Sequence, residues 1–209
     1  MMSAVDYSVY LVTDEACLGG RDLLTCVRQA LEGGVTCVQY RAKNAIGGKM
    51  YIEALALKHL CGEFNVPLII NDRLDIAQAV GAAGVHLGQG DLPCGVARKI
   101  LGADFIIGVS AHNVSEAMQA VRDGASYLGC GAVFGTTTKA DVTALGLDNL
   151  RAIRQAVDIP IVGIGGVTVA NYALVRQTGA DGAAIVSGIL AQADVQLAAA
   201  HIKEQARRF

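Results

Sequence analysis

Eight short apolar runs recur along this chain, and the segments between them have the spacing of amphipathic helices. Runs that are apolar on both faces and bounded by Pro or Gly are typical of strands buried in a parallel sheet. Eight strands that alternate with helices favour an α/β fold, a closed (β/α)8 TIM barrel. The expected strands cover residues 7–13, 35–40, 105–109, 127–130, 161–164 and 183–186, with two more inside 66–91.

Helical periodicity fills the gaps between the runs, and four glycines each end an expected helix just before an even-numbered strand. These glycines are Gly33, Gly81, Gly124 and Gly179. The expected helices cover residues 21–32, 50–64, 74–80, 96–101, 115–122, 147–156, 169–177 and 195–207. The pairs Gly19–Gly20 and Gly47–Gly48 are interpreted as loop residues. A doubly wound open sheet is the alternative fold, but no G-x-G-x-x-G follows the first strand.

The composition supports one large interior. The chain has 209 residues, which suits a single barrel domain over 1–209, and hydrophobic residues make up 53% of it. No stretch approaches the roughly 18 unbroken apolar residues of a membrane helix. The net charge of -2 gives no electrostatic reason to expect nucleic acid as a partner.

The N-terminus and the cysteines favour a cytoplasmic protein. The first residues lack the basic and apolar regions of a signal peptide. The six cysteines show no C-x-x-C pair and no zinc-like spacing, so we interpret them as reduced core residues. The oligomeric state stays open, and a homo-oligomer is compatible with the sequence.

Two neighbouring strands inside 66–91 end in acidic and amide side chains. Asn71 and Asp72 follow the first of these strands, and Asp91 follows the second. Because a barrel binds ligands at the C-terminal ends of its strands, these residues should lie on one rim. Two carboxylates there suit Mg2+, which takes oxygen ligands and substrate phosphates. The alternative is that Asp72 caps the following helix and Asp91 sits in a turn.

Positive charge is expected on the same rim. Arg41, Lys43 and Lys139 each follow a predicted strand in a chain that has only 17% charged residues. Cations beside carboxylates suit a diphosphate bridged by Mg2+. The alternative is a set of solvated loop charges that contribute little.

A second anion site is expected after the seventh and eighth strands. Gly165–Gly166 and Ser187–Gly188 each lead into a helix, so backbone N–H groups can hold a phosphate there. The hydroxyl-rich loop 136–139 also suits phosphate, although a polar surface loop would have the same composition. His86 and His112 are candidate acid–base groups. We expect His86 to pack within its strand and His112 to line the rim or cap a helix.

These residues together resemble thiamine phosphate synthase over nearly the whole chain. The motifs that carry the resemblance are Val38-Gln39-Tyr40-Arg41-Ala42-Lys43, Leu68-Ile69-Ile70-Asn71-Asp72-Arg73, Gly84-Val85-His86-Leu87-Gly88-Gln89, Gly108-Val109-Ser110, Thr136-x-Thr138-Lys139 and Ile164-Gly165-Gly166.

The resemblance implies an enzyme that joins 4-amino-2-methyl-5-(diphosphooxymethyl)pyrimidine to a thiazole ethyl phosphate and releases diphosphate. The residues that it implies for the pyrimidine diphosphate are Gln39, Arg41, Lys43, Asn71, Ser110 and Lys139. Tyr40 and Ala42, which lie between the first three of these in the chain, are expected among the substrate-binding residues. Those that it implies for the thiazole phosphate are Thr136, Thr137, Thr138, Gly166, Val186 and Ser187. It implies Asp72 and Asp91 as ligands of Mg2+, and Arg41, Lys43, Ser110 and Lys139 as the catalytic group.

The resemblance also implies a dissociative mechanism, in which diphosphate leaves before the thiazole nitrogen attacks. Tyr40 and Ala42 stand where the family usually has Leu and Glu, and Gly135 and Thr137 stand at usual Pro positions, which changes what fixes the loop shape. Two alternatives remain. One is a thiazole tautomerase of the same superfamily, and the other is a non-catalytic barrel that binds thiamine precursors.

Overall fold

The computed structural model describes residues 5–135 and 145–209, and its eight parallel strands form a closed barrel. Each strand pairs with the next in chain order, and β8 pairs with β1 to close the sheet. The predicted barrel is therefore confirmed, and the doubly wound alternative was wrong. The strands are β1 (Val9–Val12), β2 (Cys37–Tyr40), β3 (Leu68–Asn71), β4 (Gly84–Leu87), β5 (Ile106–Ala111), β6 (Tyr127–Gly131), β7 (Ile161–Ile164) and β8 (Gly182–Ile185).

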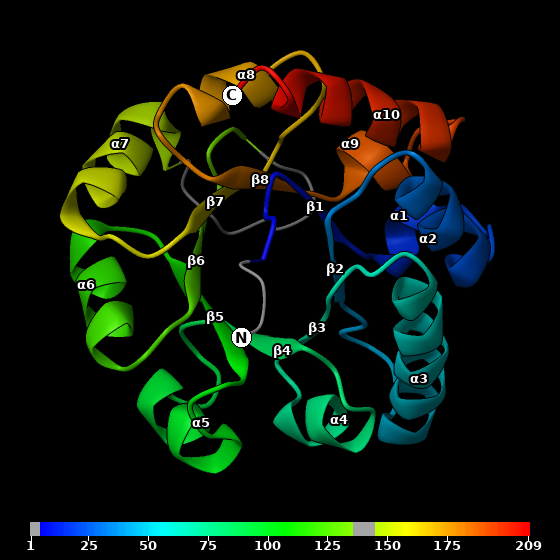
Figure 1. Cartoon of the computed structure of the whole chain (residues 1–209), viewed down its shortest axis with the longest axis horizontal. Helices are drawn as coiled ribbons and strands as arrows, with labels where there is room; N and C mark the ends of the chain where they lie inside the picture. The colour runs from blue at the N-terminus through cyan, green and yellow to red at the C-terminus, as the bar shows by residue number, and fades with distance from the viewer. Residues whose placement is uncertain (1–4, 136–144) are drawn as a thin grey trace.

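Helices surround the barrel in a view down its axis (Figure 1). Within the described ranges they are α1 (Glu15–Leu18), α2 (Leu23–Glu32), α3 (Gly47–Glu63), α4 (Leu74–Ala79), α5 (Cys94–Leu101), α6 (Val114–Arg122), α7 (Gly146–Ala156), α8 (Tyr172–Arg176), α9 (Ser187–Leu190) and α10 (Val195–Ala206). The eight predicted helices are present, whereas α1 and α9 were not predicted. Gly47–Gly48 was wrongly interpreted as loop. Both residues lie in the first turn of α3, where glycine is tolerated because the first N–H groups have no partner inside the helix.

The hydrophobic residues form two cores, one inside the barrel and one between the barrel and its helices. Alternation along β2 separates them: Cys37 belongs to the inner core, while Val38 and Tyr40 belong to the outer one. All six cysteines are free, and all but Cys17 are buried, as expected. Of the helices in the described ranges, none is long and apolar enough to cross a membrane.

Close packing of β8 against the residues just before β1 predicts a large loss of stability from a single added methyl group. A Cβ at Gly182 would lie 1.8 Å from the backbone oxygen of Tyr7. Gly182→Ala should therefore lower the free energy of unfolding by about 1–3 kcal/mol. The control is Gly62→Ala, because Gly62 is exposed in α3 with nothing within 4 Å of its added Cβ. That change should raise stability by up to about 1 kcal/mol. Urea titrations of both variants test the contrast, and an unchanged midpoint for Gly182→Ala would contradict it.

Candidate functional site

A cavity of about 160 Å3 opens at the C-terminal ends of the strands. Ten of the residues predicted for the site line it. They are Gln39, Arg41, Lys43, Asn71, Asp72, Asp91, Ser110, Gly166, Val186 and Ser187. The cavity therefore lies where a TIM barrel places its active site.

The cations at one side of this cavity are each paired with a carboxylate. Arg41 donates to Asp14, whose other oxygen caps α1 by accepting from the N–H of Ala16. Lys43 donates to Asp72. The backbone N–H of Arg41 also donates to the hydroxyl of Thr13, at 2.9 Å, so the residue is fixed to the end of β1. An anionic ligand would meet positioned cations here.

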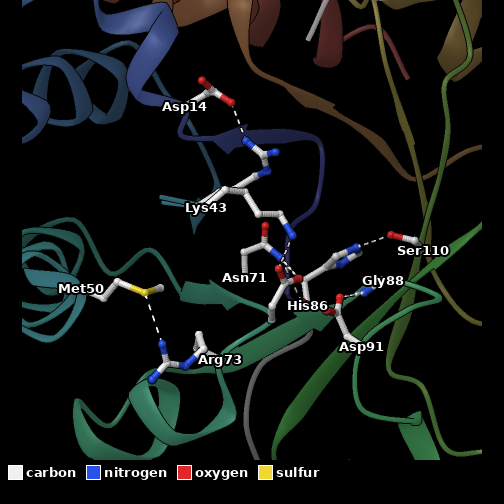
Figure 2. A network of polar contacts seen from close by, with 11 residues as sticks. Asp14, Lys43, Met50, Asn71, Arg73, His86, Gly88, Asp91 and Ser110 are labelled. Carbon is white, nitrogen blue, oxygen red and sulfur yellow. Dashed lines mark hydrogen bonds and ion pairs between the residues drawn. The ribbon is translucent and has the colours of Figure 1, made fainter. Parts of the chain in front are cut away.

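Two carboxylates face each other beside these cations. Asp72 adopts a left-handed backbone conformation, with a φ of 63°, which Asp tolerates better than most residues. The N–H of Asp72 donates to the backbone oxygen of His86 at 2.8 Å, and Asp91 accepts from the N–H of Gly88 at 2.7 Å. Burial raises the pKa of Asp91, and the neighbouring carboxylate of Asp72 adds to the effect. Figure 2 shows Lys43, Asn71 and Asp91 converging on this point.

A cation placed between these carboxylates would relieve their repulsion. The described residues contain no group of three or more His, Cys, Asp or Glu side chains that could hold a metal ion. Two carboxylates suit Mg2+ because this ion often binds through one or two carboxylates and completes its shell with phosphate oxygens and water. The donor set thus fits a magnesium site that is completed by a phosphorylated ligand.

Deeper in the barrel, a hydrogen-bond chain crosses from one wall to the other. Gln39 Nε2 donates to the Tyr10 hydroxyl at 2.9 Å, and the hydroxyls of Tyr10 and Tyr127 lie 2.6 Å apart. His86 Nδ1 lies 2.9 Å from the Tyr127 hydroxyl, and His86 Nε2 lies 3.1 Å from Ser110 Oγ. The chain therefore links two residues of the cavity lining, Gln39 and Ser110, through the barrel interior. We call these five residues the interior chain.

Two glycines make room for the rings of the interior chain. A Cβ at Gly108 in β5 would lie 2.2 Å from Cζ of Tyr127, and a Cβ at Gly129 in β6 would lie 2.8 Å from Cε1 of His86. Tyr7 also packs on Tyr127, with ring centroids 4.7 Å apart. His86 was expected to pack within its strand, and the structure gives its ring polar partners as well. Neither Tyr10 nor Tyr127 was predicted for the site.

The opposite wall of the cavity is made of backbone-rich turns. Gly165 and Gly166 follow β7 with φ values of 100° and 67°, which glycine adopts without strain. Val186 and Ser187 follow β8, and Ser187 begins the short helix α9. Loops after the seventh and eighth strands, with a short extra helix, are a frequent phosphate site in TIM barrels.

The remaining predicted residues have different positions. The side chain of Tyr40 belongs to the outer core, where its hydroxyl donates to Glu53 of α3. Ala42 lines a separate hollow beside Asp72. Thr136, Thr137, Thr138 and Lys139 lie outside the described residues. His112 lines the cavity, as expected, and its backbone N–H and ring Nδ1 lie 2.8 and 2.9 Å from Glu116 Oε2.

Comparison with known proteins gives consistent matches. A family model described as thiamine monophosphate synthase matches residues 9–189. A thiamine-phosphate synthase of Chloroflexus aurantiacus is 53% identical over 200 residues, which is 95% of this chain and 92% of that protein. One of Clostridium acetobutylicum is 48% identical over 99% of this chain and 94% of its own length. The solved thiamine phosphate pyrophosphorylase of Pyrococcus furiosus aligns with a TM-score of 0.91 and 38% identity, over 98% of this chain and 97% of that one.

Proposed function

Because this chain belongs to the thiamine monophosphate synthase family, we propose that it is a thiamine-phosphate synthase, a transferase that joins the pyrimidine and thiazole halves of thiamine phosphate. The observation that carries the proposal is that the cavity has two different walls, each of which suits an anion. One wall has paired cations and carboxylates that suit a diphosphate. The other has glycine turns after β7 and β8 that suit a single phosphate.

On the charged wall, Arg41 and Lys43 bind and orient the diphosphate. Both side chains are already held at the rim by ion pairs with Asp14 and Asp72. Negative charge grows on the diphosphate as it leaves in a dissociative substitution, so fixed cations stabilise the transition state more than the bound substrate. Asn71 and Ser110 supply further polar groups to the same ligand. From the sequence alone, Lys139 joins this set and Thr136, Thr137 and Thr138 join the thiazole phosphate site.

Asp72 and Asp91 would hold Mg2+. When bound, the ion would neutralise charge on the diphosphate oxygens. The two aspartates fit this role because their carboxylates face each other and the pKa of Asp91 is raised by burial and by Asp72. We further propose that the chain acts in the cytoplasm.

The thiazole phosphate site predicts a selective effect of Ser187→Asp. Ser187 is exposed at the start of α9 and lines the cavity, so the new side chain should be accommodated by the fold. Its carboxylate would face a phosphate, and like charges repel. The Kd for the thiazole phosphate should rise about 10- to 100-fold, while the Kd for the pyrimidine diphosphate changes little. Calorimetry with each ligand separately measures both effects, and equal losses would count against the assignment.

The proposal as a whole is tested by incubating the protein with both substrates and Mg2+. Formation of thiamine phosphate together with diphosphate supports it. A tautomerase would change the thiazole phosphate alone and would need no diphosphate substrate. A binding protein would take up the precursors without turnover. Chromatography of the products therefore separates the three functions in one assay.

A further inference from the structure

Tyr127 has a position in the site that the proposed function does not use. It is fully buried in β6 and does not line the cavity, but its hydroxyl joins the two halves of the interior chain. It lies 2.6 Å from the hydroxyl of Tyr10 and 2.9 Å from Nδ1 of His86. Gly108 has no side chain, and the ring of Tyr127 fills the space beside it. A polar ring at the centre of a barrel needs both partners, because an unpaired buried hydroxyl is costly.

The first donor favours one direction along the interior chain. Gln39 donates its amide N–H to Tyr10, which leaves the Tyr10 proton for Tyr127 or for the thiol of Cys37. A thiol is the weaker acceptor, so the favoured direction has Tyr10 giving its proton to Tyr127. Burial raises the pKa of both phenols well above their usual range, so both keep their protons. Tyr127 then donates to Nδ1 of His86, which is the acceptor nitrogen. In a neutral imidazole the proton therefore sits on Nε2.

The tautomer of His86 decides what Ser110 can offer a ligand. With the proton on Nε2, His86 donates to Ser110 Oγ, and the serine hydroxyl keeps its hydrogen for an acceptor atom in the cavity. With the proton on Nδ1, the serine hydroxyl would instead donate its hydrogen to Nε2 of His86. We propose that Tyr127 is a positioning residue that holds His86 in the Nε2–H form and so keeps Ser110 as a donor toward the pyrimidine diphosphate. The identity of this ligand rests on the proposed function, whereas the tautomer does not.

Nitrogen NMR of protein labelled with 15N-histidine tests the tautomer directly. The chain has four histidines, so the signals of His86 are identified by their absence from the His86→Gln variant. We expect the Nε2–H form in the unmodified protein. In Tyr127→Phe we expect a mixture of both tautomers, since the donor to Nδ1 is lost. An Nδ1–H form in the unmodified protein, or the same pure tautomer in both proteins, would overturn the proposal.

Steady-state kinetics with a matched variant test the consequence for Ser110. Tyr127→Phe should lower kcat/KM for the pyrimidine diphosphate about tenfold, the equivalent of one hydrogen bond, with the KM for the thiazole phosphate unchanged. Tyr172→Phe is the control, because Tyr172 is also fully buried and donates to the backbone oxygen of Ser8 at 2.7 Å, outside the barrel. Both variants should melt a few degrees early.

Only the change at position 127 should affect kcat/KM. Equal kinetic losses in the two variants would show a general structural effect and overturn the role of Tyr127. If the protein formed no thiamine phosphate at all, the proposed function would fail, while the NMR measurement would still decide the role of Tyr127. The two proposals can therefore fail separately.

Discussion

Arg41→Ala should lower kcat/KM for the pyrimidine diphosphate by about 10²–10³, or roughly 3–4 kcal/mol of transition-state stabilisation. The guanidinium is largely buried at the rim and paired with Asp14, and the backbone N–H of Arg41 donates to the hydroxyl of Thr13, so the residue is positioned before any ligand binds. Fixed donors of this kind contribute most where charge develops in the reaction. Arg41→Lys should recover part of the loss, because it keeps the charge but not the planar pair of donors.

Arg28→Ala is the matched control for this loss. Arg28 also makes an ion pair, with Glu63, but both side chains are about half exposed on the surface and neither lines the cavity. Exposed pairs contribute little, so kcat/KM and the melting temperature should both stay nearly unchanged. Single-turnover kinetics and melting curves separate binding, chemistry and folding. A change of less than fivefold for Arg41→Ala would contradict its place in the diphosphate site.

Removing divalent metal should reduce the rate of thiamine phosphate formation by about 10³ or more, since a bound cation can stabilise the transition state by several kcal/mol. The expectation follows from Asp72 and Asp91, because the neighbouring carboxylate of Asp72 helps to raise the pKa of Asp91 and a divalent cation would offset that repulsion. Added Mg2+ should restore the rate. Full turnover after exhaustive chelation would refute the magnesium site.

Asp91→Asn tests the same site without an activity assay. Asparagine keeps an oxygen for the N–H of Gly88 but loses the charge. Mg2+ with inorganic diphosphate should raise the melting temperature of the unmodified protein and have little effect on this variant. Asp22→Asn is the control, because Asp22 caps α2 by accepting from the N–H of Thr25 and does not line the cavity. Asparagine is an equally good cap, so its response to Mg2+ should be normal.

The fold was predictable because its strands are buried on both faces. In β3, for example, the apolar run Leu68–Ile70 is preceded by Pro67 and ends at Asn71, and eight such runs leave few possible topologies. The rim was predictable for a related reason. Polar side chains such as Asn71 and Asp72 stand out where an apolar run ends, and parallel strands all end on the same side. Among the helices of residues 5–135 and 145–209, α1 and α9 were not predicted, since four residues are too few to show a helical period.

The interior chain was not predictable because an all-apolar strand hides which face is inside. Gln39 lines the cavity and Tyr40 packs toward the helices. Both lie in β2, where the sequence does not show which residues face inward. Tyr10 and Tyr127 looked like ordinary core residues for that reason. The strand register, which pairs Gly108 with Tyr127 and Asn71 with His86, decides which side chains meet. Register is a property of the closed barrel and not of any single run.

The space that Gly108 leaves for Tyr127 ties two positions of the chain together during evolution. A Cβ at 108 would lie 2.2 Å from the ring, so a larger residue there demands a smaller one at 127. A smaller residue at 127 in turn loses the hydrogen bonds to Tyr10 and His86. A protein with tyrosine at 127 can therefore replace Gly108 only if residue 127 changes as well. Either replacement alone should give a less stable protein. Sequence drift in β5 is thus conditional on β6, although the two strands are adjacent in the barrel and nearly twenty residues apart in the chain.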